Sequence, residues 1–519
     1  MSVTNVRIIT DALGGSALSR LLQSGAAPDR WMPAAPRTPT EWRARAALRA
    51  GERDWEECWS ALEPALLATG AAGERLQRVR TEGGVVITTG QQPGLFGGPI
   101  YTFSKAMSAL ALADVIERET GVATAAIFWA ATDDADFAEA SSTVVARAGG
   151  VDVLRSECAP PAGTPMSLAP LGDLSVLRAR LRDGAASAAD TWALDAVDHS
   201  YGSATRTTGD AFVLLLRELL APFGMPVLDA SHAAVRTASH ATLRAALGAA
   251  EPIERALVER GSDIRGAGMA PQVVDVPGLT LVFTRDGTVK QRIPLSGAVA
   301  ASTDAGAWLT PNVLLRPIAE HAILPTIAYV AGPGELAYFA QVSAVADAMG
   351  VAPPLALPRW SCTLIEPSAE RLLQRLNVTP DALDRPDALE GAVARAAMTE
   401  RSGKALAAVR QVISTLPADL APEADPLGLG GAVQGAMQSL QHRVDRLERR
   451  LVAGIKRREQ GVLRDVATLR GALRPLNMRQ ERALNLVPIL SRHGRAVLSD
   501  MHASALDHAA HLVARMSTS

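Results

Sequence analysis

A glycine-rich stretch at residues 89–105, TGQQPGLFGGPIYTFSK, has the residue types of an anion-binding turn. Backbone amides of the turn and the positive end of the helix after it would stabilise negative charge. Gln91 and Gln92 add amide groups, and Lys105 lies about two turns into that helix, within reach of the turn. The stretch matches neither the P-loop nor the dinucleotide-binding pattern, so a tight structural turn is the alternative. The glycines concerned are Gly90, Gly94, Gly97 and Gly98.

An acidic segment, TDDADFAEA, follows the apolar run at 123–132. Four carboxylates so close together repel one another unless they are solvated, paired with bases or bridged by a cation. The candidate roles are general base, ligand of a substrate ammonium, and Mg²⁺ ligand at Asp134 and Asp136, and a solvated acidic loop is the alternative. The four carboxylates are Asp133, Asp134, Asp136 and Glu139.

A third candidate segment is GPGELAYFAQ, where Gly332 and Gly334 form a permissive turn before a helix. Spacings of three and six residues are expected to place Glu335, Tyr338 and Gln341 along one helix face. Such a face could also be a buried surface with polar fixings. Arg316 and Arg359 are candidates for binding phosphate or carboxylate, although arginine is abundant throughout the chain.

Other catalytic patterns are absent from the sequence. It contains no GxSxG elbow and no HExxH, and the histidines near residues 502–511 are better explained by helix packing than by metal binding. Cys58, Cys158 and Cys362 are far apart with no CxxC pair, which predicts reduced, mostly buried thiols. Of the 52 basic residues, only Lys105, Lys290, Lys404 and Lys456 are lysines, and a retained lysine suggests a specific role.

The elements around the first two segments predict how they meet. The run GGVVITTG indicates a buried strand, 101–121 a helix, and ATAAIFWAAT a second strand, which together form a parallel α/β unit. In open parallel sheets, ligands bind beyond the carboxyl ends of the strands. The glycine turn and the acidic segment both follow such ends, so we expect them to share one site.

The C-terminal part is predicted to be helical. Leu440, Val444, Leu447 and Leu451 repeat with a 4-3-4 spacing, and Val466, Leu469 and Leu473 resume it after a phase shift. This pattern predicts a coiled-coil-like seam. A homodimer would use the seam between two chains, and the alternative is that it folds back on its own chain.

Charge and hydropathy exclude several classes. The 519 residues carry a formal net charge of -2 and no basic block, so no nucleic-acid partner is expected. No apolar run approaches the ~18 residues that a bilayer-spanning helix needs, and no secretory signal opens the sequence. These features predict a cytoplasmic protein without a membrane partner.

Four ordered blocks resemble the BshC family, the cysteine-adding enzymes of bacillithiol synthesis. They are TGQQPGLFGGPIYTFSKA, PNVLLRPIAEHAILPTIAYVAGPGELAYFAQ, PRWSCTLIEP and LRPLNMRQERALNLVPILSRHG. The resemblance implies a Rossmann-like core with helical insertions and a C-terminal coiled coil associated with dimerisation. It also implies that L-cysteine is joined, through its carboxyl group, to the amine of glucosaminyl-malate. The glycine turn, the acidic segment after Trp129 and residues 332–341 would surround the reaction site.

The pattern of strand and helix signals along the chain gives the expected domains. Residues 1–150 are the first part of the Rossmann-like core with N-terminal helices, and 151–267 are a mainly helical insertion that returns to the core near 222–232. Residues 268–385 are the second part of the core, with a hairpin turning at Asp286-Gly287, and 386–519 are the helical coiled-coil domain.

The chain departs from the family at one position of the acidic segment. The family usually has a histidine between the last two aspartates, where this chain has Ala135. Because amide formation from a free carboxylate is uphill in water, the resemblance leads us to expect activation by ATP. Lys105 would neutralise phosphate, the carboxylates would bind Mg²⁺ or ammonium, and Asp134 or Asp136 would accept the amine proton. A related ligase or nucleotidyltransferase for a different amine, or a catalytically weak coiled-coil scaffold, are the alternative functions.

Overall fold

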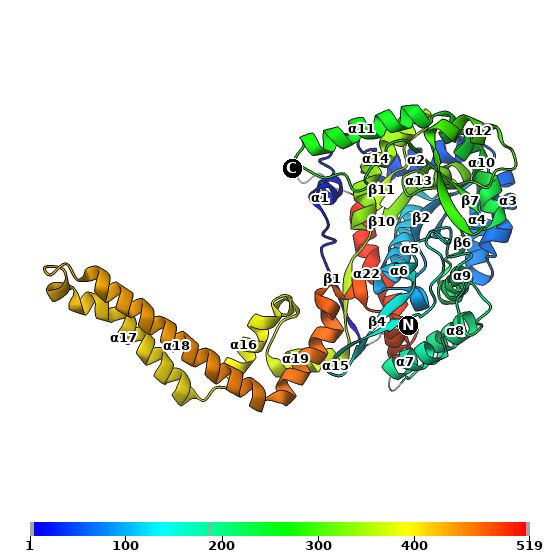
Figure 1. Ribbon diagram of the computed structural model, residues 1–519. Coiled ribbons are helices and arrows are strands. Elements are labelled where there is room, and N and C mark those ends of the chain that lie inside the picture. Colours follow the sequence, from blue (N-terminus) through cyan, green and yellow to red (C-terminus); the bar gives the residue numbers. More distant parts are fainter. Residues whose placement is uncertain (1–4, 186–187, 515–519) are drawn as a thin grey trace. The chain divides into compact units, whose positions relative to one another are not determined.

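A computed structural model describes residues 5–185 and 188–514 (Figure 1). By internal contacts the chain forms two compact units. The sheet unit contains described residues up to 145, 153–365 and from 480 onward. The hairpin unit contains residues 146–152 and 366–479.

The centre of the sheet unit is a five-stranded parallel sheet in the order β11-β10-β2-β3-β6. The strands are β2 (Val85–Gln91), β3 (Thr124–Ala130), β6 (Val227–Asp229), β10 (Thr326–Ala331) and β11 (Ala356–Pro358). Strands β2 and β3 pair from Val85↔Thr124 to Gln91↔Ala130 and are buried along almost their whole length. Their continuous apolar runs are typical of a parallel sheet covered on both faces.

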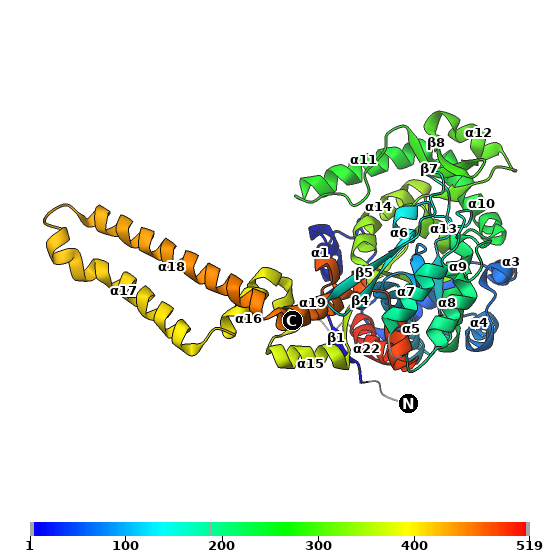
Figure 2. The same cartoon turned by 60° about the horizontal axis from the view of Figure 1, so that its bottom comes forward.

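Helix α5 (Ile100–Thr120) connects β2 to β3 and is buried nearly all round. It packs against both strands and along α22 (Ala496–Val513), which lies beside it in both ribbon views (Figures 1 and 2). The predicted strand, helix and strand of this unit are confirmed. The β10 strand leads into α14 (Pro333–Met349), which places residues 332–335 at the same sheet edge as the ends of β2 and β3.

The N-terminal region is helical, as predicted, with one exception. Strand β1 (Arg7–Thr10) pairs antiparallel with β12 (Cys362–Ile365), which no local pattern indicated. The helices are α1 (Ala17–Ser24), α2 (Pro39–Gly51), α3 (Glu56–Leu66) and α4 (Gly70–Glu82).

The predicted insertion is mainly helical, and its return to the sheet as β6 is confirmed. Its first residues instead form a strand, β5. The remaining elements from the acidic segment to the end of the insertion are α6 (Phe137–Ala140), β4 (Ser142–Arg147), β5 (Gly150–Arg155), α7 (Ser175–Ala185), α8 (Trp192–Tyr201), α9 (Thr208–Leu220), α10 (Ala233–Gly248) and α11 (Ala250–Gly266).

The hairpin predicted at Asp286-Gly287 is confirmed, with Gly287 in the left-handed region at φ 58°. Its strands are β7 (Leu279–Asp286) and β8 (Val289–Pro294), and β9 (Thr310–Pro311) joins β7. Helices α12 (Ala298–Thr303) and α13 (Arg316–Ile323) complete this region.

The hairpin unit is helical, and its longest helices, α17 and α18, pack on each other. Arg410 joins them through an ion pair to Asp445 (2.9 Å) and a second one to Glu448. The two helices therefore pair within the chain, while the seam residues Leu440, Leu447 and Leu451 of α18 stay largely exposed. The helices are α15 (Pro367–Leu376), α16 (Pro386–Ala396), α17 (Glu400–Ala424), α18 (Gly430–Arg458) and α19 (Gln460–Leu473).

The two compact units differ from the predicted domains at two places. Residues 366–385 were expected in the core but belong to the hairpin unit, where α15 packs on α19. Residues 480–514 were expected in the coiled-coil domain but belong to the sheet unit, because the apolar face of α22 is buried against α5. The last helices are α20 (Gln480–Ala483), α21 (Val487–His493) and α22, and residues 515–519 lie outside the described range.

Among the helices of the described ranges, none combines the length and the apolar character needed to cross a bilayer. Cys58, Cys158 and Cys362 are free thiols, with Cys58 and Cys362 buried, as predicted.

Candidate functional site

A cavity of about 730 Å³ opens at the carboxyl ends of β2, β3 and β10. Its volume lies within the range that holds small-molecule ligands and cofactors. The turn after β2, the acidic segment after β3, the start of α14 and the β7–β8 hairpin all contribute to its wall. Lys105 and Asp134 therefore face one shared space, as the parallel-strand argument predicted.

Lys105 reaches back along α5 to the end of β2 and is only 4% exposed. Its Nζ donates to the Gly90 carbonyl (2.7 Å) and to Gln91 Oε1 (2.9 Å), and it lies 2.5 Å from Glu335 Oε2. Burial lowers the pKa of Lys105, and the Glu335 charge opposes this shift. The ammonium is thus held by three oxygens in a water-poor wall of the cavity.

Glu335 is the central acceptor at the start of α14. Its Oε1 accepts the Tyr329 hydroxyl (2.6 Å), and its Oε2 accepts the Gly332 N–H (2.7 Å). Burial alone would raise the pKa of Glu335, but the Lys105 charge and these hydrogen bonds hold it below its ordinary value. Glu335 and Lys105 therefore form a buried ion pair.

Arg316, at the first turn of α13, belongs to the same wall. Its guanidinium pairs with Glu320 (2.7 Å), donates to the Tyr338 hydroxyl (3.2 Å) and lies 4.8 Å from the centre of the Tyr329 ring. The predicted residues Arg316, Glu335 and Tyr338 are thus brought together. The network fixes both tyrosine rings beside the cavity.

The acidic segment forms another part of the wall, with Asp133, Asp134 and Asp136 lining the cavity. Asp134 Oδ1 accepts the Asp136 N–H (2.8 Å), and Asp136 Oδ1 caps α6 by accepting the Glu139 N–H (3.3 Å). Burial raises the pKa of Asp134, and the hydrogen bond from Asp136 opposes the shift. This carboxyl has the raised proton affinity that suits a general base.

Glu139 does not line the cavity, but it holds side chains that do. Its carboxylate accepts the Tyr101 hydroxyl (2.9 Å) and an N–H of Gln92. Gln91 Nε2 in turn donates to the Tyr101 oxygen (3.1 Å). Gln91, Gln92 and Tyr101 therefore connect the glycine turn to the acidic segment.

Three of the predicted glycines lie elsewhere. Gly94, Gly97 and Gly98 are absent from the cavity wall, so the expectation that their amides face a ligand is wrong. Gly97 and Gly98 adopt φ values of 88° and 74°, and the Asn485 amide fills the turn by donating to the Phe96 carbonyl (2.9 Å). At the start of α5 the Ile100 N–H is taken by the Leu484 carbonyl (2.8 Å). This turn is structural, whereas Gly90, Gly332 and Gly334 do line the cavity.

Gln341 is also misplaced by the sequence argument. It is fully buried and does not face the cavity; its amide bonds both the N–H (2.9 Å) and the carbonyl (2.8 Å) of Val273. Val273 itself lines the cavity. Gln341 therefore fixes the backbone of Val273, a residue of the cavity wall, and does not itself face the cavity.

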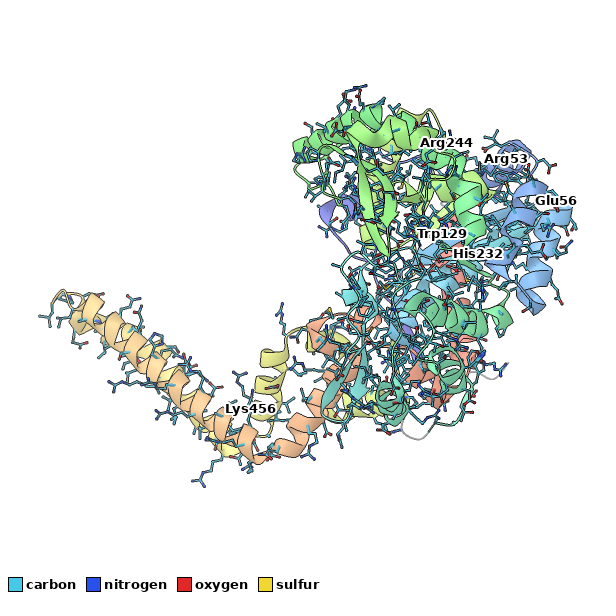
Figure 3. The ribbon with its side chains drawn as sticks, turned by 45° about the vertical axis from the view of Figure 1, so that its right-hand side comes forward. Arg53, Glu56, Trp129, His232, Arg244 and Lys456 are labelled. Carbon is cyan, nitrogen blue, oxygen red and sulfur yellow. The ribbon has the colours of Figure 1, made fainter. Side chains whose placement is uncertain are left out.

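Trp129, at the end of β3, lines the cavity as predicted and lies within the crowded side chains of the sheet unit (Figure 3). Its indole Nε1 is buried and has no hydrogen-bond partner within residues 5–185 and 188–514.

Several cavity residues were missed or undervalued. Lys290 on β8 donates to the Asp133 carbonyl (2.7 Å) and lies 3.7 Å from its Oδ2; as one of four lysines it carried a usable signal. Arg359, considered for anion binding, does line the cavity. The remaining basic and aromatic members are Tyr101, Phe283, Arg292, Tyr329 and Arg482.

The carboxylates do not make a preformed magnesium site. In the described ranges no group of three His, Cys, Asp or Glu side chains could hold a metal ion. Asp134 and Asp136 each already accept a backbone N–H, and Lys290 lies against Asp133. The protein donors therefore do not fit Mg²⁺ held by the chain alone, which requires near-octahedral oxygen ligands.

Two family models match the chain. The family model described as the N-terminal Rossmann-like domain of bacillithiol biosynthesis BshC matches residues 36–304 and 299–360. The model described as the C-terminal coiled-coil domain of the same family matches residues 362–514.

Similar proteins cover most of the chain. A protein of Solibacter usitatus named "Putative cysteine ligase BshC" is 30% identical over 84% of this chain and 85% of its own length. A protein of Koribacter versatilis with the same name is 30% identical over 81% of each chain. One from Geobacillus thermodenitrificans, also so named, is 26% identical over 82% of this chain and 83% of its own. With both family domains matched in order, the chain belongs to the BshC family.

Proposed function

We propose that this protein is a ligase that joins the carboxyl group of L-cysteine to the amine of glucosaminyl-malate, forming the amide of bacillithiol. The name shared by its relatives supports the ligase class and the cysteine substrate. The observation that carries the proposal is the single cavity in which Lys105 and Asp134 face the same space. One wall can neutralise an anion, and the other can accept a proton.

Activation of the cysteine carboxyl would come from ATP. A free carboxylate is a poor acyl donor, and transfer of an adenylyl or phosphoryl group gives the acyl carbon a good leaving group. Stabilising the charge that develops on phosphate requires fixed cations, and the cavity wall supplies Lys105, Arg292 and Arg316 among others. No step of the proposal is assigned to a metal ion, because the carboxylates do not form a site for one.

The acyl transfer then needs a neutral amine. The glucosamine nitrogen attacks the activated carbonyl carbon, the C–N bond forms, and AMP or phosphate leaves with the electrons of the broken C–O bond. The nitrogen loses one proton in this step. Asp134 is placed to accept it, because burial has raised its proton affinity while Asp136 is committed to capping α6.

A second function is a related ligase that acts on a different amine. The observation in its favour is Ala135, whose small side chain lines the cavity beside Asp134. The histidine that the family usually has at this position would fill space that Ala135 leaves open to the acceptor.

The test incubates purified protein with cysteine and glucosaminyl-malate, with and without ATP, and follows the product by mass spectrometry and AMP or ADP by chromatography. We expect bacillithiol to form only with ATP and in step with nucleotide release. Lys105→Met should abolish product, while Lys404→Met, an exposed lysine of the hairpin unit, should leave it unchanged. Product without nucleotide turnover would defeat the ATP step, and product only with another amine would favour the second function.

A further inference from the structure

Arg359 is a buried cavity residue whose guanidinium has one nitrogen without a hydrogen-bond partner among the described residues. It is 2% exposed, and its two terminal nitrogens form a bidentate pair with Glu481 at 2.7 Å each. Its Nε is buried and has no hydrogen-bond partner in the part of the chain that the structure describes. A buried, unsatisfied donor costs free energy, so a ligand atom that accepts from it would be bound favourably.

This Nε lies beside the start of α14. A Cβ atom built on Gly332 would be 3.2 Å from Glu335 Oε2, 3.6 Å from Lys105 Cε and 3.8 Å from Arg359 Nε, so the Lys105–Glu335 ion pair and the Arg359 guanidinium both flank this glycine. Gly332 caps a 17-residue helix, and Gly334 in its first turn lines the cavity. The first N–H groups of a helix lack acceptors within it, and its dipole favours negative charge. The buried nitrogen and the helix start therefore favour the same kind of ligand, an anion.

Arg482 adds a charge without a counter-ion. It follows Glu481 directly in α20, is exposed and lines the cavity, and no acidic partner pairs with it within the described residues. In this corner Glu335 offsets Lys105 and Glu481 offsets Arg359. Arg482 leaves an excess of one positive charge in the same cavity that Gly334 of α14 lines.

The corner is separated from the acidic segment by Tyr101. The Arg359 guanidinium lies 6.0 Å from the centre of the Tyr101 ring, while the hydroxyl of the same ring bonds Glu139. The cavity thus has a cationic end and an acidic end. A ligand with carboxylates at one end and an amine at the other would match both.

We propose that Arg482, Arg359 Nε and the start of α14 bind the malate carboxylates of the acceptor, which directs its amine toward Asp134. This inference rests on the proposed function. Carboxylate and phosphate share the chemistry that the site recognises. The small excess of positive charge suits a dicarboxylate better than the four charges of a nucleoside triphosphate.

The experiment measures binding by calorimetry, separately from turnover. The probes are glucosaminyl-malate, the methyl glycoside of glucosamine (which lacks malate), L-malate, inorganic phosphate and ATP. The variants are Arg482→Ala, Arg482→Lys and, as a matched control, Arg255→Ala, an exposed arginine of α11. Because Arg482 is exposed and unpaired, its replacement should leave the thermal melting curve unchanged.

We expect Arg482→Ala to weaken the binding of glucosaminyl-malate and of L-malate by at least roughly 10-fold, because one charge-assisted hydrogen bond is lost. Binding of the methyl glycoside and of ATP should not change, Arg482→Lys should recover part of the loss, and Arg255→Ala should bind like the wild type. Wild-type affinity for glucosaminyl-malate in Arg482→Ala would overturn the proposal. So would a loss confined to ATP and phosphate.

Two results distinguish a failure of the proposed ligase function from a failure of the proposed malate site. If malate binding depends on Arg482 but no cysteine adduct forms, the subsite stands and the ligase activity fails. If bacillithiol forms in Arg482→Ala with an unchanged KM for glucosaminyl-malate, the activity stands and the subsite fails.

Discussion

Asp134 links the chemistry of the site to the stability of the fold. Burial raises its pKa above the ordinary value of 3.8. The native state therefore binds this proton more tightly than the unfolded chain does. The resulting stabilisation is fully present below the ordinary pKa and is lost as the pH rises through the raised value. At neutral pH the ionised carboxylate is a cost to the fold, as expected for a group kept for function.

Replacing Asp134 with asparagine should consequently raise stability and remove activity. We expect Asp134→Asn to melt at a higher temperature at pH 7 and to lower kcat/KM at least about 100-fold, the usual contribution of a general base. The acidic limb of the wild-type pH profile should disappear from the residual rate. Asp419→Asn, on the exposed surface of α17, is the matched control. An unchanged acidic limb would assign the proton to another group.

The Lys105–Glu335 pair allows structural and catalytic roles to be separated. Lys105→Met leaves a buried carboxylate uncompensated, and we expect it to lower the free energy of unfolding by roughly 3–5 kcal/mol. The double variant Lys105→Met with Glu335→Gln removes both charges and should recover most of that loss, as measured by urea denaturation. Product formation should remain absent from the double variant. Recovery of activity together with stability would make Lys105 a purely structural residue.

The elements that position the site were predictable where the information is local. The β2 and β3 segments are short buried runs, glycines precede β2 and lie on both sides of α5, and the order of the three segments predicts a parallel unit. The shared cavity followed from that order. The role of Gly97 and Gly98 did not, because Asn485, which fills their turn, lies 387 positions from Gly98. No local pattern indicates such a partner.

The prediction that Gln341 shares a helix face with Glu335 was wrong for a geometric reason. Residues three apart on a helix differ by about 60° around its axis, but residues six apart differ by about 120°. Tyr338 therefore stays near the face of Glu335, while Gln341 turns away into the protein and meets Val273. The segment 269–278 between α11 and β7 is held against α14 by this amide.

This contact predicts that a residue outside the cavity controls its wall. Gln341→Leu leaves the Val273 N–H and carbonyl without partners, so we expect it to cost about 1–3 kcal/mol of unfolding free energy for each group. The Val273 amide should exchange with solvent faster, and KM should rise more than kcat falls. Unchanged exchange at Val273 would mean that the segment is held by other contacts.

At the scale of the whole molecule, the candidate site belongs to only one of the two units. All residues that line the cavity belong to the sheet unit, so the hairpin unit supplies no wall to it. Composition could not place the boundary at 480, because α22 is as helical as the hairpin and differs only in what covers its apolar face. The seam residues were predicted correctly as a helical repeat, and α17 covers part of it within the same chain.

The remaining part of the seam supports the prediction of a homodimer. Leu440, Leu447 and Leu451 of α18 stay 41%, 52% and 40% exposed in the single chain, although leucines at such spacing normally pack in a coiled coil. We expect the wild type to sediment as a dimer and the variant with all three changed to glutamate to sediment as a monomer, because three buried charges from each chain at the interface would repel one another without compensation. Val258→Glu, an equally exposed apolar position of the sheet unit, controls for added charge. Since the cavity lies wholly in the sheet unit, the monomeric variant should still bind glucosaminyl-malate with wild-type affinity; a dimer that survives the three substitutions would place the interface elsewhere.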